Sequence, residues 1–124
     1  MILIGDDNIS YENIERIDSI KDISSTKPQS TALFNFDLEI LKHTQVNDIN
    51  SAVIVNNIRE VIYASSLNAR YIIVENNLSK IAQKIADNYM FDSKILVIIK
   101  DENEIEQSAI DEIDGIIYLY RIEK

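Results

Sequence analysis

The sequence contains no cysteine and no tryptophan, one proline, one histidine and two glycines. Without cysteine the chain forms no disulfide, no thiolate metal site and no thiol nucleophile, which fits a reducing compartment. Gly5 and Gly115 are too few for the glycine-rich loops with which Rossmann and Walker-type proteins cradle phosphate. The histidine, His43, has no serine or aspartate at a spacing that would recruit it as a general base, so we interpret it as a surface residue.

Long apolar runs and clustered positive charge are also lacking. No apolar run approaches the ~20 residues that a membrane span needs. The stretch Met1–Asp7 has no basic residue ahead of its apolar part, so it is typical of a strand rather than a signal peptide. Twelve basic residues are scattered among 21 acidic ones, giving a formal charge of −9, which repels phosphate backbones and anionic lipids. We expect a cytoplasmic protein with neither nucleic acid nor membrane as a direct partner.

Five apolar segments have the character of strands, and four segments with helical spacing alternate with them. The strand-like segments are 31–36, 51–55, 69–74, 94–99 and 115–120. The middle three are nearly continuous apolar runs, which is typical of parallel strands covered on both faces. The helical segments are 38–46, 58–65, 78–89 and 105–113, and this alternation predicts right-handed βαβ crossovers. We predict one α/β domain over residues 1–124, a three-layer sandwich with a five- or six-stranded, mainly parallel sheet, flavodoxin-like or related.

Polar residues beside the helical segments supply start and stop signals. Asn57 and Asp101 each precede a glutamate by three residues, as in a capping box, and Asp37 and Asn77 are candidate caps for the other two helices. Asn68 stands where a helix ends in a left-handed residue, a conformation that asparagine tolerates better than most residues. A shift of 44 residues also aligns 53–73 with 97–117 without a gap, so two strand–helix–strand units repeat.

The region between residues 8 and 30 is the least regular part of the chain. Isoleucine recurs there at every third position, Ile14, Ile17, Ile20 and Ile23, a spacing that suits neither a strand nor a long helix. We interpret it as a short strand or irregular segment near 15–19, followed by a helical turn and a polar loop.

Acidic and amide side chains follow several of the expected strands. In open parallel sheets, ligands bind beyond the carboxyl ends of the strands. Asp6, Asp7 and Asp37 fall at such ends, and carboxylate oxygens are ligands that Mg²⁺ prefers. A Mg²⁺ site built from these three aspartates is the sharpest site hypothesis. The alternative is that helix N-termini select such residues as caps, which by itself accounts for Asp37.

Two short stretches resemble known families. Residues 2–8, with the acidic pair Asp6 and Asp7, resemble the opening of response-regulator receiver domains, and Phe34–Asp37 resembles the strand that carries their phosphorylated aspartate. This resemblance implies a Mg²⁺-dependent phospho-acceptor at Asp37. The chain departs from that pattern at Asn56, where the family has serine or threonine, and at Glu75, where it has lysine.

The stretch 60–74 resembles a βα unit of phosphate-binding TIM barrels, with a helix, a small turn and a buried strand. This resemblance implies kinship of fold. The five or six strands expected here cannot close an eight-stranded barrel, and the glycine-rich phosphate-binding turns of those barrels are missing.

The final strand-like segment, Gly115–Ile122, alternates aromatic and aliphatic residues, and no helix follows to cover it. An uncovered apolar terminal strand is often hidden by pairing or self-association, so we expect a homodimer formed through this segment.

Two functions from different classes remain open. The first is a non-catalytic domain that binds a protein or a small ligand, because no catalytic signature stands out in the chain. The second is a Mg²⁺-dependent enzyme or phospho-acceptor domain that uses Asp6, Asp7 and Asp37.

Overall fold

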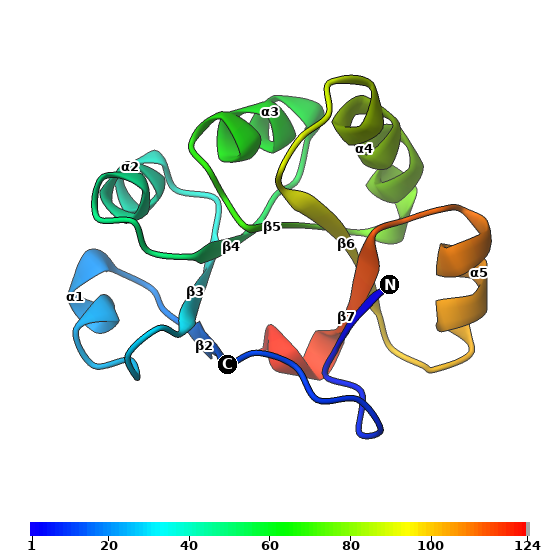
Figure 1. Ribbon diagram of the computed structural model, residues 1–124, viewed down its shortest axis with the longest axis horizontal. Coiled ribbons are helices and arrows are strands. Elements are labelled where there is room, and N and C mark those ends of the chain that lie inside the picture. Colours follow the sequence, from blue (N-terminus) through cyan, green and yellow to red (C-terminus); the bar gives the residue numbers. More distant parts are fainter. Residues whose placement is uncertain (124) are drawn as a thin grey trace.

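The computed structural model describes residues 1–123 (Figure 1). Over that range the chain forms seven strands, five α-helices and one 3-10 turn. The strands are β1 (Ile2–Ile4), β2 (Ile14–Arg16), β3 (Thr31–Asn35), β4 (Ser51–Ile54), β5 (Tyr71–Val74), β6 (Lys94–Ile99) and β7 (Gly115–Tyr118). The helices are α1 (Ile20–Ile23), α2 (Leu38–Val46), α3 (Ile58–Ser66), α4 (Asn76–Asn88) and α5 (Glu104–Ile110), and the turn is η1 (Leu119–Arg121).

All seven strands belong to one parallel sheet. Its order is β1-β7-β6-β5-β4-β3-β2, so each strand from β2 to β7 lies beside its neighbours along the chain, and β1 pairs with β7. The predicted α/β class with a parallel sheet is confirmed. The sheet has seven strands instead of five or six, because the irregular isoleucine segment also contributes a strand, β2.

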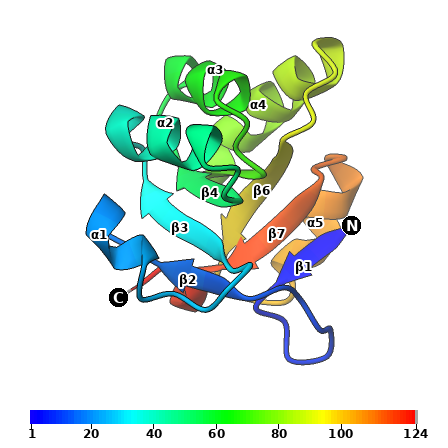
Figure 2. The same cartoon turned by 60° about the vertical axis from the view of Figure 1, so that its left-hand side comes forward.

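The sheet is curled into an incomplete roll. All five helices lie outside the roll in Figure 1, and Figure 2 shows the same arrangement from the side. One apolar cluster on the inner face contains a residue from every strand, so the two edge strands contribute to the same core. Its buried members are Ile4, Ile14, Leu33, Ala52, Tyr71, Ile73, Leu96 and Ile117. A second cluster lies between the strands and the outer helices.

The roll has a seam between β1 and β2, which are the two ends of the sheet and do not pair with each other. The segment 5–13 and η1 lie along this seam (Figure 1). Side chains of the seam bond to main-chain oxygens: Arg121 Nη2 donates to the Ile14 carbonyl at 2.9 Å, and the Tyr120 hydroxyl donates to the Gly5 carbonyl. The seam is therefore joined by side chains where a barrel would have a backbone ladder.

The predicted helix starts are confirmed in two of four cases. The side chain of Asp37 accepts from the Ile40 amide at 3.2 Å, and that of Asn57 accepts from the Glu60 amide at 2.9 Å. The prediction is wrong for Asn77, because α4 begins after Glu75. At Asp101 one half of the capping box forms, since the Glu104 carboxylate accepts from the Asp101 amide at 2.9 Å, although α5 begins after Asn103. Asn77 is inside α4, and Asp101 lies in the turn before α5.

The four helices from α2 to α5 end in the same way. The second residue after each helix is left-handed, with φ between 53° and 64°: Asp48, Asn68, Met90 and Glu112. The next amide in each case bonds to a carbonyl in the last turn, as in Ala69 N to Ala64 O at 2.9 Å, which is the Schellman arrangement. The left-handed Asn68 is thus confirmed. The 44-residue repeat is confirmed too, since β5 begins at residue 71 and β7 at residue 115.

The expectation of an uncovered terminal strand is wrong. β7 ends at Tyr118, lies between β6 and β1, and has α5 packed against it. The residues after it turn into η1 because their aromatic side chains close the seam. Within residues 1–123 we see no helix with the length and apolar character needed to cross a bilayer.

Candidate functional site

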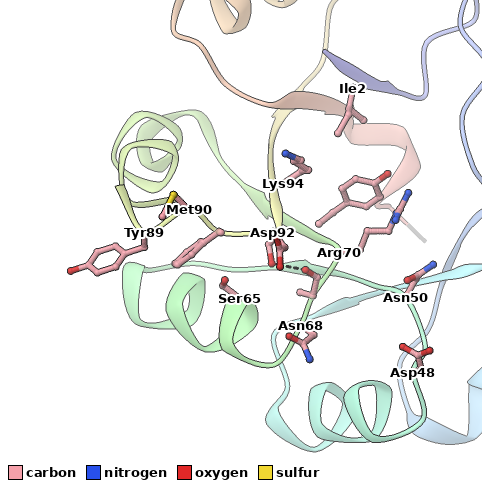
Figure 3. Close-up of a pocket in the computed structure, with 14 residues that line it drawn as sticks. Ile2, Asp48, Asn50, Ser65, Asn68, Arg70, Tyr89, Met90, Asp92 and Lys94 are labelled. Atoms are coloured by element: carbon pink, nitrogen blue, oxygen red, sulfur yellow. Dashed lines mark hydrogen bonds between the residues drawn. The ribbon is translucent and has the colours of Figure 1, made fainter. Parts of the chain in front are cut away.

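A cavity of about 790 Å³ opens at the amino ends of the central strands (Figure 3). This volume is within the range of small-ligand sites in proteins. The side chains come from the residues just before β4, β5 and β6 and from the ends of α3 and α4. The lining is Ile2, Asp48, Asn50, Ser65, Asn68, Ala69, Arg70, Tyr71, Tyr89, Met90, Phe91, Asp92, Ser93 and Lys94.

The two ends of this cavity differ in chemistry. Tyr89 and Met90 lie at one end, and Arg70 and Lys94 lie at the other, near Ile2 (Figure 3). Tyr89 is 74% exposed and Met90 is 85% exposed, so apolar surface faces solvent there. Among residues 1–123 the Lys94 ammonium has no carboxylate within the 4.0 Å limit of an ion pair. The cavity therefore offers an apolar wall and an unpaired cation.

A hydrogen-bonded network adjoins the cationic end. Glu12, from the segment before β2, accepts from Thr31 Oγ1 at 2.6 Å, from Arg70 Nε at 3.1 Å and from the Tyr71 hydroxyl. The Arg70 guanidinium also lies over the Tyr71 ring, 5.3 Å from its centre. Because these contacts connect the start of β3, the start of β5 and the seam segment, Glu12 ties one end of the sheet to its middle.

Burial and hydrogen bonding oppose each other at Glu12. Burial works to raise its pKa, but hydrogen bonds from Thr31 and Tyr71 and the charge of Arg70 outweigh it and hold the pKa of Glu12 below the ordinary 4.5. Burial, followed by the hydrogen bond to Glu12, raises the pKa of Tyr71. The network is therefore built around a carboxylate and a neutral phenol at neutral pH.

We expect Glu12→Gln to lower the free energy of unfolding by about 2 kcal/mol at pH 7, because an amide replaces a charged acceptor of three hydrogen bonds. The folded-state pKa of Glu12 is depressed, so the stabilisation by its carboxylate is present above the unfolded-state value near 4.5 and is lost as the pH falls through the lower folded-state value. In urea titrations, the difference in the free energy of unfolding between wild type and variant should therefore become smaller over that acidic pH range.

The matched control is Glu106→Gln, which removes one exposed carboxylate from the outer helix α5. It should leave stability at pH 7 within about 0.5 kcal/mol of wild type. If the difference in the free energy of unfolding between wild type and Glu12→Gln stayed constant from pH 7 to pH 3, the stabilising role of the Glu12 carboxylate would be contradicted.

The three predicted metal ligands lie in two places. Asp6 and Asp7 line a hollow of about 380 Å³ at the carboxyl ends of β1, β6 and β7, together with Lys100, Asp101 and Glu102. Asp6 is nearly buried and accepts from the Asn8 amide at 2.8 Å. Asp37 follows β3 and caps α2. Among residues 1–123 we see no group of three or more acidic or histidine side chains placed to hold a metal ion. The Mg²⁺ site at Asp6, Asp7 and Asp37 stays a prediction.

Little in the sequence points to the cavity at the amino ends of the strands. Glu12 and Arg70 are 58 residues apart along the chain, and no spacing rule connects them. Tyr71 carried one usable signal, because a phenol inside a buried strand normally needs a hydrogen-bond partner. That signal predicts that the Tyr71 hydroxyl has a hydrogen-bond partner, but it does not identify the partner as Glu12.

The sequence was compared with protein-family models and with curated proteins, and neither comparison gives a match.

Proposed function

We propose that this protein is a non-catalytic binding domain whose ligand, a small amphipathic molecule with one anionic group, occupies the cavity at the amino ends of the strands. One observation carries the proposal: a single concave site contains both a cation without an ion-pair partner, Lys94, and the exposed apolar side chains of Tyr89 and Met90.

The lining argues for this class of ligand over others. Tyr89 and Met90 offer an adaptable apolar surface, since methionine and aromatic side chains accommodate ligands of varied shape. Lys94 can hold an anion without first losing a protein partner, whereas the Arg70 Nε already donates to Glu12. The lining also contains Asp48 and Asp92, which disfavour a ligand of high negative charge. A single anionic group on an apolar body fits these requirements.

A fluorescent probe tests the proposal. The probe 1-anilinonaphthalene-8-sulfonate has an apolar aromatic body and one sulfonate, and its emission rises when it leaves water. We expect saturable binding to the folded protein, and we expect Lys94→Gln to weaken it about 5-fold, which is the loss of one exposed charge–charge contact of about 1 kcal/mol.

Lys42→Gln is the control, because it removes the same charge from the exposed face of α2. It should leave probe affinity unchanged, and all variants should melt at the temperature of the wild type. Equal weakening by both substitutions would show attraction by general charge only and would overturn the proposal. The proposal would also be overturned if the probe still bound Lys94→Gln and only a folded protein partner displaced it, because the site would then bind a protein.

We further propose that the protein resides in the cytoplasm. The support is its cysteine-free composition and its strong negative charge, which suit a reducing compartment.

Self-association is a separate proposal. The C-terminal segment that suggested a homodimer is an inner strand followed by a turn, but Tyr120 remains 55% exposed at the seam. Light scattering at tens of micromolar decides the matter, because a dimer doubles the 14.2 kDa mass of the chain.

A further inference from the structure

Two arginines beside β2 have guanidinium nitrogens that are buried without an acceptor. In Arg16 these are Nε and Nη1, and in Arg121 it is Nε. Within residues 1–123 neither side chain has a carboxylate within the 4.0 Å limit of an ion pair. The chain carries 21 acidic residues, so the absence of a partner at these two positions is not a shortage of carboxylates.

The two arginines converge on the same short strand. Arg16 is the last residue of β2 and follows Ile14 by two residues, so it projects to the same face, the inside of the roll. Arg121 reaches β2 from η1, where its Nη2 donates to the Ile14 carbonyl at 2.9 Å. The Arg121 guanidinium is also held over the ring of Tyr11, 5.6 Å from its centre. Both cations therefore stand beside β2, at the seam.

A buried guanidinium nitrogen without an acceptor is costly, because its N–H group has left water and gained no hydrogen bond. A protein retains such a group where another acceptor completes it, and arginine's fork of donors matches a tetrahedral or planar oxyanion. We propose that Arg16 and Arg121 form a binding site for a small oxyanion of the phosphate class, beside β2 at the seam. Neither arginine lines the cavity of the proposed function, so this site is independent of it.

The experiment is a thermal melt in inorganic phosphate at constant ionic strength. We expect about 10 mM phosphate to raise the Tm of the wild type by about 5 °C, as mass action predicts for a Kd near 1 mM. Arg16→Met replaces the unpaired cation with an apolar side chain of similar reach. It should melt above the wild type without phosphate and should not respond to phosphate.

Arg59→Met is the control, because it makes the same change of charge at an exposed position of α3. Its phosphate response should equal that of the wild type. Equal responses in all three proteins would show only the general salting effect of phosphate and would overturn the proposal, as would a wild type that does not respond. An Arg16→Met protein that melts lower than the wild type, or fails to fold, would overturn the view that Arg16 lacks a partner.

Arg16→Lys keeps the charge and removes the fork of donors. With an oxyanion at the site it should fold and lose most of the phosphate response, and titration calorimetry should show the same order of affinities. A full response in Arg16→Lys would mean that a point charge suffices, which contradicts a site built on guanidinium geometry.

Discussion

Gly115→Ala should be the most damaging single methyl group that can be added at a glycine of this protein, lowering the free energy of unfolding by about 3 kcal/mol. A Cβ at residue 115 would lie 2.5 Å from the Ile2 carbonyl oxygen, 2.6 Å from the Ile2 Cβ and 2.8 Å from a Leu96 methyl. The nearest atom belongs to the backbone of β1, so the clash is relieved only by moving that strand away from β7.

Urea unfolding measures this loss, and hydrogen exchange locates it at the amides of β1. The comparison is Gly5→Ala, where the strain has a different origin. Gly5 has φ of +96°, and the nearest atoms to a new Cβ are side-chain atoms, Arg121 Cγ at 2.9 Å and Tyr118 Cβ at 3.1 Å. The left-handed backbone costs about 1–2 kcal/mol there. A Gly115→Ala protein within about 1 kcal/mol of the wild type would contradict the tight approach of β1 to β7.

The second large effect is a gain. Asp48, Met90 and Glu112 each hold a left-handed conformation that glycine adopts without a steric penalty. Replacing all three with glycine should raise the free energy of unfolding by about 2 kcal/mol, since each site gains about 1–2 kcal/mol of relieved strain and loses part of it to the greater freedom of the unfolded chain. The melting temperature should rise by about 8 °C.

Two controls bracket this prediction. Asn68→Gly should give a smaller gain, because asparagine already tolerates the left-handed region. Glu106→Gly, in the first turn of α5, should instead cost about 1 kcal/mol, because glycine gives the unfolded chain more freedom and the helix loses an acidic side chain near its positive end. A triple variant less stable than the wild type would mean that these side chains make contacts worth more than the strain.

The α/β class could be predicted because most of the apolar runs are long enough to be identified as strands. Segments such as 71–74 and 94–99 are buried on both faces, so their composition alone identified them as strands of a parallel sheet. The strand β2 has only three residues, of which one is fully buried, and its isoleucine spacing continues into α1. A signal that short does not separate a strand from a turn, which is why the sheet has more strands than predicted.

The curl of the sheet and the cavity could not be predicted in the same way. Curling depends on how β1 and β2 approach across the seam, and that approach rests on single contacts such as Arg121 with the Ile14 carbonyl. In the sequence, Arg70 and Lys94 are two of the scattered basic residues. Only the register of β5 and β6 brings them to the same cavity. Asp37 was identified twice, as a cap and as a ligand, and the structure confirms the cap.

The pairing of β1 with β7 sets the order in which the molecule can be completed. Within the described residues, every other pairing joins two strands that are consecutive along the chain, whereas the pairing of β1 with β7 joins Ile2 to Gly115. A contact between such distant residues forms late, because the long loop between them must first be closed or filled with structure. During synthesis on the ribosome, β1 must therefore wait for its partner until β7 has left the exit tunnel.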